Sequence, residues 1–424
     1  MDLRLNSQCT QRSANGYHKM AAFLSICECG ADISNYEHKF CTSCGRELLP
    51  DEKSIITFYF SRGFEYKSIL HMLSKQHGIK MSERTLKNRL KEFGLRRKLA
   101  LYDEIEVRRH IEQEMEGPGC MAGYRSMWHT LSMKGIQVPR RVVEEIMREL
   151  DPEGCETRRR KRLRRRKYRA PGPNYCWHVD GYDKLKPYGF PIHGCIDGWS
   201  RKIMWLQLAR SNNLPETAAS NFVDCVHDYG GCPVKLRTNC GTENVIMAAM
   251  QCEFRQDVDA SIYGPSPANQ RIEGWWSFYR RNRSTWWINY FQDMIENEKF
   301  NPGSELEKEC IWFSFSGIIQ KDLDFVKEHW NTHRIRDSRH DTVSGRPDEL
   351  FCLPEDHGGV DGLILPISAA QIDHFRENFL QVEEETNVYQ EYFNYVLSNS
   401  NLQEPSDWKE AERLYLDLLS VARR

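Results

Sequence analysis

Apolar positions between residues 51 and 98 recur with the period of helices. The pattern predicts helices over Asp51–Arg62 and Tyr66–His77, each followed by a glycine. Ser82 is a suitable N-cap for a third helix that reaches Phe93. A helix, a turn that contains glycine and a second helix form the helix-turn-helix pattern. Residues 51–98 are therefore predicted to form a helix-turn-helix domain.

The third predicted helix has a polar face suited to DNA. Its solvent side would present side chains that can reach base edges and phosphates, namely Arg84, Lys87, Asn88 and Lys91. The alternative is an ordinary helical bundle with a basic face, because three-helix units also serve as connectors.

A second helical module is predicted over residues 101–152. One helix opens at Gly123, a turn follows at 134–136, and Pro139 precedes a helix over Arg140–Leu150. Two helix-turn-helix candidates in tandem suggest that a longer stretch of DNA is read.

Beyond residue 172 the pattern changes to strands that alternate with helices. Strands are predicted at Tyr175–Val179, Pro191–Ile196, Lys202–Leu208, Val234–Arg237 and Ala260–Tyr263. Helices are predicted at Glu216–Tyr229, Thr242–Phe254 and Pro267–Arg280, the last with Ser266 as its N-cap. This order predicts an α/β fold of the RNase H-like class, with a mixed five-stranded sheet.

Length, composition and charge indicate that the chain contains further segments besides this fold. At 424 residues the chain has room for two to four domains, and 40% hydrophobic residues exclude wholesale disorder. The net charge of -1 hides a strong segregation, since ten of the twelve residues from 158 to 169 are Lys or Arg. Within this run Arg158, Arg164 and Arg165 are candidate DNA contacts, because such a run neutralises phosphates. A nuclear import signal is the other interpretation, and both can hold together.

The cysteines suggest a metal rather than disulfides. There are 15 cysteines, and the sequence shows neither a signal peptide nor an apolar stretch long enough for a membrane span. A reducing compartment is expected, the nucleus being favoured over the cytosol. Two close pairs, Cys27 with Cys29 and Cys41 with Cys44, fit a zinc ribbon over residues 27–48 that binds structural Zn²⁺. Four unrelated cysteines in a loop are the alternative.

Four segments of the α/β region carry a more specific resemblance. They resemble the catalytic core of retroviral and transposon integrases, over residues 173–350, and begin at Trp177, His193, Arg237 and Ser266: WHVDG, HGCIDGWSR, RTNCGTEN and SPANQRIE. The segments WNTHR at 330–334 and GRP at 345–347 are similar to those that close many such cores. The preceding helical modules look like those of transposon-derived integrases of animals.

The resemblance implies a metal site with an altered ligand. In the family an Asp, a second Asp and a Glu bind two Mg²⁺ or Mn²⁺ ions, which activate the attacking oxygen and stabilise the leaving one. Asp180 matches the first position and Glu273 the third, whereas Asn239 stands at the second, 34 positions before Glu273. An amide oxygen can still face a cation, but one negative charge is lost. The resemblance thus predicts weakened or absent metal binding and impaired strand transfer.

Neighbouring residues are given other roles. Asp197 is expected to be a structural or turn-capping residue, and Glu243 is expected to face away from the site rather than to compensate for Asn239. Arg271, in the last helix, is a further candidate DNA contact. The aromatic residues of that helix are expected to divide between the core and a grip on DNA.

The complete division of the chain has seven segments. They are a flexible N-terminus at 1–26, the zinc ribbon at 27–48, the helical modules at 51–98 and 101–152, a basic linker at 153–172, the integrase core at 173–350 and an acidic helical region at 351–424. The acidic region, with Glu383, Glu384 and Glu385, is expected to be a solvated face or a surface for a protein partner. Integrase cores commonly act as multimers, so the formation of a homo-oligomer is an open question. A membrane partner is not expected.

Three hypotheses about function remain. The first is a domesticated transposon integrase that binds DNA in the nucleus and has lost most of its catalysis. The second is an active metal-dependent recombinase with an altered site. The third is a protein-interaction scaffold that keeps the fold but neither DNA binding nor chemistry.

Overall fold

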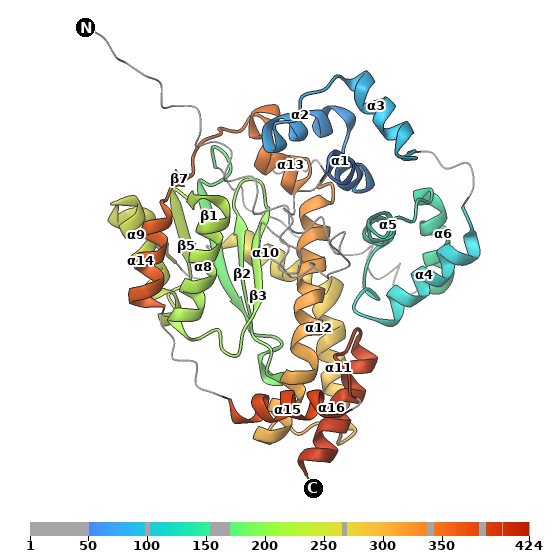
Figure 1. Ribbon diagram of the computed structural model, residues 1–424, viewed down its shortest axis with the longest axis vertical. Helices are drawn as coiled ribbons and strands as arrows, with labels where there is room; N and C mark the ends of the chain where they lie inside the picture. Colours follow the sequence, from blue (N-terminus) through green and yellow to red (C-terminus); the bar gives the residue numbers. More distant parts are fainter. Residues whose placement is uncertain are drawn as a thin grey trace.

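The structure is a computed structural model, and it describes seven stretches of the chain. They are residues 51–97, 102–152, 170–264, 269–336, 343–380, 387–400 and 402–423. The predicted zinc ribbon with Cys27, Cys29, Cys41 and Cys44, and the basic residues Arg158, Arg164 and Arg165, lie outside them. Figure 1 shows the described elements in their order along the chain.

The first three-helix unit consists of α1 (Glu52–Ser61), α2 (Tyr66–His77) and α3 (Glu83–Glu92). The predicted boundaries are confirmed to within one residue at each end. Ser82 accepts a hydrogen bond from the Thr85 backbone N–H and so caps α3, as predicted. Gly78 ends α2 with a positive φ of 68°, a conformation that glycine adopts without strain. Apolar residues of all three helices share one small core.

The second three-helix unit consists of α4 (Glu104–Glu116), α5 (Tyr124–Met133) and α6 (Arg140–Leu150). Helices α5 and α6 begin where the sequence places them. Helix α4, which buries only Val107 and Ile111, is not predicted from the sequence. Two buried apolar residues in a helix rich in charged residues give too weak a periodic signal to be recognised.

The centre of the molecule is a mixed five-stranded sheet in the order β3-β2-β1-β5-β6. The strands are β1 (Cys176–Tyr182), β2 (Ile192–Asp197), β3 (Ile203–Leu208), β5 (Lys235–Thr238) and β6 (Ser261–Tyr263). Strands β1, β2 and β3 are antiparallel neighbours, whereas β5 runs parallel to β1, and β6 parallel to β5. The predicted RNase H-like α/β architecture is consistent with this sheet. Strand β1 extends beyond the predicted end at Val179, because Gly181 and Tyr182 still pair with β2.

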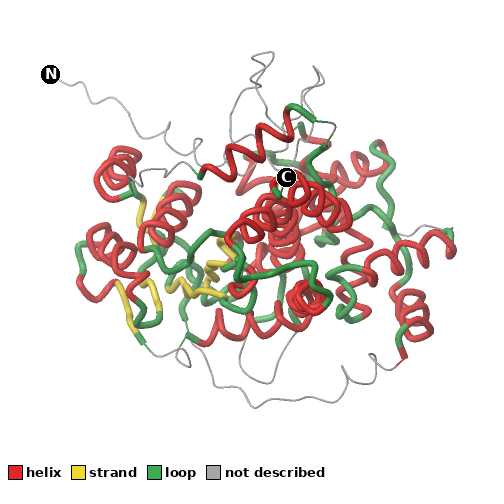
Figure 2. Tube along the Cα trace, turned by 90° about the horizontal axis from the view of Figure 1, so that it is seen from below, coloured by secondary structure: helices red, strands yellow, loops and turns green. Residues whose placement is uncertain are grey.

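Helices cover both faces of this sheet, as the view from below also shows (Figure 2). One face packs against α8 (Pro215–Tyr229), α9 (Val245–Arg255) and α14 (Ala369–Phe379). The other packs against α10 (Gln270–Tyr279), α11 (Thr285–Glu296) and the 28-residue α12 (Glu305–Thr332). Along β1 the side chains alternate between the layers, so Trp177 and Val179 face α8, whereas Tyr182 packs toward α10. Within the described stretches, no helix has the length and apolar character needed to cross a membrane.

Two of the predicted helix starts in the core are wrong. Helix α10 begins at Gln270 with Asn269 at its N-cap, so Asn269 lies before the helix rather than in it as predicted; the predicted cap Ser266 and first residue Pro267 lie outside the described residues. The chain from Thr242 first forms a 3₁₀ turn over Thr242–Asn244, and α9 follows only at Val245. In both places an asparagine side chain bonds to another part of the core, as described below.

The C-terminal region is helical, as predicted, and it packs against the core. Helices α15 (Val388–Ser398) and α16 (Trp408–Ala422) follow the short α13 (Pro347–Cys352) and α14. Helix α16 buries five residues, namely Ala411, Leu414, Tyr415, Leu418 and Leu419, mostly against α12. The small strands β4 (Gly231–Cys232) and β7 (Leu365–Pro366) pair in a second sheet. This region therefore completes the core, and only part of it is the solvated face that was expected; Glu383, Glu384 and Glu385 lie outside the described residues.

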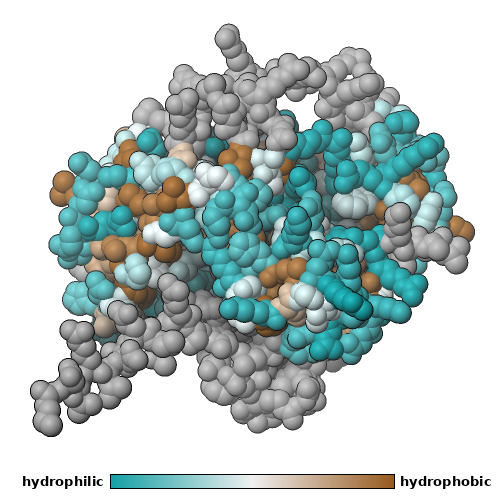
Figure 3. Space-filling view, turned by 90° about the horizontal axis from the view of Figure 1, so that it is seen from above, coloured by the Kyte–Doolittle hydropathy of each residue, from teal (hydrophilic) through white to brown (hydrophobic). Residues whose placement is uncertain are grey.

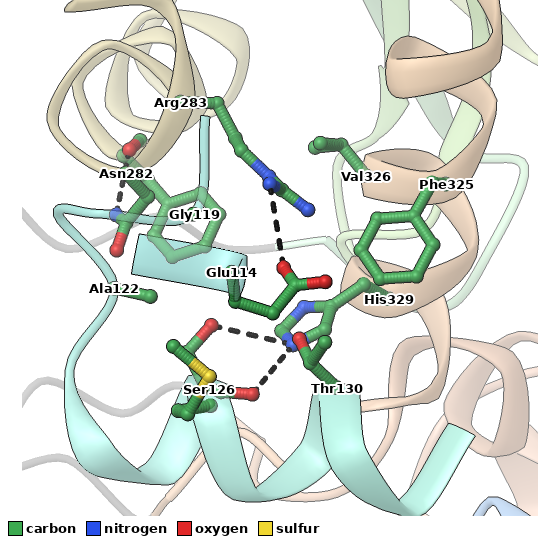
Figure 4. Close-up of a pocket in the computed structure, with 12 residues that line it drawn as sticks. Glu114, Gly119, Ala122, Ser126, Thr130, Asn282, Arg283, Phe325, Val326 and His329 are labelled. Atoms are coloured by element: carbon green, nitrogen blue, oxygen red, sulfur yellow. Dashed lines mark hydrogen bonds and ion pairs between the residues drawn. The ribbon is translucent and has the colours of Figure 1, made fainter. Parts of the chain in front are cut away.

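Helix α12 joins the three-helix units to the sheet. Asn331, near its C-terminus, donates to and accepts from the backbone of Ile203 in β3, at 3.0 and 2.8 Å. The second unit contacts the same helix, where the His329 ring meets the Ser126 hydroxyl at 3.3 Å. Figure 4 shows His329 directed toward Ser126, in a small cavity between α4, α5 and α12. The three residues that match the integrase motif do not line this cavity.

Candidate functional site

Asp180 lies in β1, on the face of the sheet that α10 covers. Its Cα pairs with that of Gly194 in the neighbouring strand β2. Both oxygens of its carboxylate accept hydrogen bonds from side chains: Trp276 Nε1 lies 3.2 Å from Oδ2, and Asn239 Nδ2 lies 3.3 Å from Oδ1. The two side chains that bond to the Asp180 carboxylate are therefore neutral N–H donors.

Asn239 follows directly after β5, the strand parallel to β1. This placement brings its side chain beside Asp180, because the carboxyl ends of parallel strands meet at one edge of a sheet. Its amide oxygen accepts a hydrogen bond of 2.6 Å from Asn244 Nδ2, and the Gly241 backbone N–H approaches the same oxygen at 3.4 Å. The sequence-predicted position of Asn239 next to Asp180 is thus what the structure shows.

The orientation of the Asn239 amide follows from its neighbours. Asn244 Nδ2 also donates to the Glu243 carboxylate at 3.0 Å, which fixes the Asn244 amide. With Asn244 presenting N–H groups, Asn239 must turn its oxygen toward Asn244 and its N–H₂ toward Asp180. A chain of hydrogen bonds therefore runs from Glu243 through Asn244 and Asn239 to Asp180. Glu243 was expected to face away, but its carboxylate instead anchors this chain.

Glu273 occupies the first turn of α10, as predicted. The helix is fastened to β1 by Asn269, whose amide donates to the Val179 carbonyl at 2.8 Å and whose oxygen meets the His178 ring at 2.8 Å. These bonds place the start of α10 over β1 and bring Glu273 close to Asp180. Among the described residues, the Glu273 carboxylate has no hydrogen-bond partner.

Burial and like charge leave the two acids difficult to ionise together. Burial, reinforced by the nearby negative charge of Glu273, raises the pKa of Asp180 to about 7, and the Trp276 hydrogen bond opposes this only in part. Burial also raises the pKa of Glu273. A raised pKa is expected where carboxylates share a site without an added positive charge.

Trp276 can reach Asp180 because the opposite strand carries a glycine. The indole lies against Gly194, where a Cβ would come within 2.8 Å of the ring carbon Cη2 and within 3.0 Å of Leu206. Its ring also packs on Tyr182, with centroids 5.0 Å apart. The pairing of Asp180 with Gly194 across β1 and β2 thus makes room for the tryptophan that holds the carboxylate.

The arrangement does not fit a pair of divalent cations. Such a pair needs several anionic oxygens directed at one place, and here one oxygen position belongs to a neutral amide. The oxygen of that amide is directed at Asn244 and Gly241, and both Asp180 oxygens already accept N–H bonds. Among the described residues no three His, Cys, Asp or Glu side chains gather as metal ligands.

Asp197 has the structural role that was predicted. Its carboxylate is fully buried and accepts four hydrogen bonds from three residues. The donors are the Asn174 and Ser200 backbone N–H groups and the Ser200 hydroxyl, each at 2.7 Å, and the Trp199 N–H at 3.1 Å. It therefore caps the turn that follows β2.

The predicted DNA contacts fall into different surroundings. Arg84, Lys87, Asn88 and Lys91 are all exposed on α3. Arg271 is half-buried, and its charge, after burial itself, lowers the pKa of Arg201 to about 10. Of the aromatic residues after Glu273, Trp275, Trp276, Tyr279 and Trp287 are buried, which leaves few to grip a DNA strand.

The comparison with known protein families supports an integrase fold for the central domain. Residues 167–352 match the family model of the integrase core domain. This segment is an integrase core. It belongs to the retroviral and transposon superfamily that the sequence motifs resemble. No curated protein matches the chain.

Three residues of the integrase site were not identified as site residues from the sequence. The sequence predicts no charge at Asn244, a core or DNA-contacting role for the aromatic Trp276, and no separate role for Asn269 within its motif. Their roles depend on which strands are neighbours. The one signal in the sequence is their position, since each lies within five residues of Asn239 or Glu273.

Proposed function

We propose that this protein is a transposon-derived integrase that binds DNA and has lost, or retains only weakly, the strand transfer that its fold supports. The observation that carries the proposal is the amide of Asn239, which donates a hydrogen bond to Asp180 at 3.3 Å where the family motif has a second aspartate. A hydrogen bond from the neutral Asn239 amide to Asp180 thus takes the place of two carboxylates that would bind the same cations.

The size of the expected defect follows from charge. Removing one carboxylate from a partly buried metal site costs several kcal/mol of metal binding and transition-state stabilisation. Since about 1.4 kcal/mol is a factor of ten in rate, strand transfer is reduced roughly a thousandfold or more. Binding of Mg²⁺ or Mn²⁺ is weakened for the same reason.

DNA binding is supported by features away from this site. The α3 helix presents Arg84, Asn88 and Lys91 to solvent, and the run of ten basic residues at 158–169 supplies charge for phosphates. The same run supports a nuclear location. A structural Zn²⁺ bound by Cys27, Cys29, Cys41 and Cys44 belongs to the proposal as well, and metal analysis of the purified chain tests it.

The decisive experiment compares the native chain with Asn239→Asp in a Mn²⁺-dependent assay of plasmid nicking and strand transfer. We expect little or no product from the native chain and at least a hundredfold more from Asn239→Asp. The matched control carries Glu273→Gln in addition to Asn239→Asp, and it should return to the native level.

Each alternative corresponds to a distinct result. Efficient strand transfer by the native chain, abolished by Glu273→Gln, would show an active recombinase and overturn the loss of catalysis. Absence of salt-dependent DNA binding by the native chain would favour the protein-interaction scaffold. A silent Asn239→Asp variant would mean that more than one charge separates this site from an active one.

A further inference from the structure

The two three-helix units resemble each other in outline but differ in surface charge. Helix α3 has four basic and two acidic residues, whereas α6, its counterpart in the second unit, has three of each. The net charges are therefore +2 and zero. A surface that neutralises phosphates needs an excess of positive charge.

Two of the three arginines of α6 pair with carboxylates of the same helix. Arg141 bonds to Glu145 at 2.7 Å, and Arg148 bonds to Glu144 at 3.2 Å, both along the helix. Arg140 stacks on the Trp128 ring at 4.6 Å. An arginine that already faces a carboxylate must give up that partner to bind a phosphate, so α6 offers little to DNA.

Helix α3 has both paired and unpaired basic residues: Lys87 pairs with Glu83 at 2.7 Å, and Arg89 pairs with Glu52 and Glu92 at 3.0 and 2.9 Å. Within the described stretches Arg84, Lys91 and two further exposed residues, Lys67 and Lys80, form no ion pair with a carboxylate. Lys67 lies in the first turn of α2, and Lys80 lies in the turn that leads into α3. The hydrogen bond from Lys87 and, less strongly, the charge of Lys67 lower the pKa of Glu83, so Lys67 lies near the start of α3.

The first unit is fixed to the core through surfaces other than α3. Arg62 of α1 bonds to Glu328 of α12, and Lys75 of α2 bonds to Glu355 and Asp361 at 2.9 and 2.8 Å. Helix α3 therefore lies at the outside of the molecule (Figure 1). Seen from above, on the side where these helices lie, the described surface is mostly hydrophilic with several hydrophobic patches (Figure 3).

We propose that α3 is the DNA-reading helix of this protein, that Lys67 and Lys80 are phosphate contacts beside its N-terminal end, and that the α4–α6 unit does not read bases. The partner is double-stranded DNA with α3 in the major groove, since the N-terminal residues of a recognition helix meet base edges and the preceding helix crosses the backbone. The inference rests on the proposed DNA binding and adds which surface performs it.

The test measures binding of the full chain to a duplex selected from a random pool, across a range of salt concentrations. Lys67→Ala and Lys80→Ala should each weaken binding to all duplexes and lower the slope of log affinity against log salt by about 0.9. Arg84→Ala should weaken preference at one or two base pairs, by roughly 5- to 100-fold. The matched controls Arg141→Ala and Arg148→Ala should leave affinity and slope unchanged.

The outcomes separate this inference from the proposed function. If the native chain binds no duplex, the proposed DNA binding fails and the inference falls with it. If it binds, but the α6 variants weaken binding as much as the Lys67 and Lys80 variants do, only the inference is overturned. Unchanged salt slopes for both lysine variants would overturn the phosphate contacts.

Discussion

Asp180 and Asp197 lie on neighbouring strands of one sheet and differ in how their carboxylates are held. Asp197 accepts four hydrogen bonds, three of them at 2.7 Å. Asp180 accepts two long bonds, at 3.2 and 3.3 Å, and shares its surroundings with Glu273. An acid that holds the fold is fully satisfied by hydrogen bonds from its own chain, whereas Asp180, which matches a motif position of the integrase core, accepts only two long ones.

The largest difference between the two acids should appear when each is replaced by its amide. Asp197→Asn places an N–H₂ group among donors that have no other acceptor, and we expect a loss of about 2–4 kcal/mol in the free energy of unfolding. Asp180→Asn removes a carboxylate whose ionised form burial disfavours, and we expect no loss at pH 7 and a gain of up to about 2–4 kcal/mol. Urea unfolding at pH 7 measures the free energy of unfolding of both variants. Equal losses for the two would contradict the difference between Asp180 and Asp197.

The second prediction concerns pH. The pKa of Asp180 in the folded protein is raised to about 7, above the value near 3.8 of an unfolded chain. Its contribution to stability is therefore fully present below pH 4 and is lost as pH rises to 7, by about 2–4 kcal/mol. Buried histidines such as His178, whose pKa burial lowers to about 3, change stability in the opposite sense below pH 6.5.

For this reason the informative quantity is the difference between two stability curves, that of the native chain and that of Asp180→Asn. The histidine contributions cancel in this difference. We expect the native chain to lose stability relative to the variant between pH 4 and 7. A flat difference would mean that Asp180 titrates in its ordinary range.

The third prediction uses two glycines on either side of the site. Gly194→Ala should displace Trp276 and cost about 1–3 kcal/mol, because the new methyl group would meet the indole at 2.8 Å. Gly274→Ala, in α10, meets no atom within 4 Å and should stabilise the helix by about 0.5–1 kcal/mol. Thermal unfolding of both variants checks this pair, and a neutral Gly194→Ala would contradict the close packing of Trp276.

The last prediction concerns Trp276→Phe and a shift in one pKa. Loss of the indole N–H removes one hydrogen bond to Asp180, which is worth about 1 kcal/mol. The pKa of Asp180 should rise further, because that bond favours the ionised carboxylate. NMR titration of the Asp180 carboxyl measures this shift, and an unchanged pKa would show that the bond does not form in solution.

Much of the fold follows from local patterns in the sequence. The helices from Glu52 to Glu92 and the main strands could be predicted because caps, glycines and apolar spacing act over a few residues. Helix α4 and the short β4–β7 pair could not, since the first has a weak apolar face and the second joins segments far apart in the chain.

The site could be predicted in its positions but not in its contacts. Motif spacing was enough to place Asp180, Asn239 and Glu273 together. The bonds from Trp276 to Asp180 and from Asn244 to Asn239 depend on strand register and on the glycine at 194. Such contacts between distant segments are decided by packing, which a single sequence does not display.

The central claim is that the amide of Asn239 replaces a charge needed for metal binding. Calorimetric titration of the full chain with Mn²⁺ at pH 8, where Asp180 is ionised, tests it most directly when native and Asn239→Asp chains are compared after loading with Zn²⁺. We predict no binding heat from the native chain up to millimolar Mn²⁺, and binding at least tenfold tighter, lost again with Glu273→Gln, in Asn239→Asp. Equal Mn²⁺ affinity of the native and Asn239→Asp chains would contradict the account.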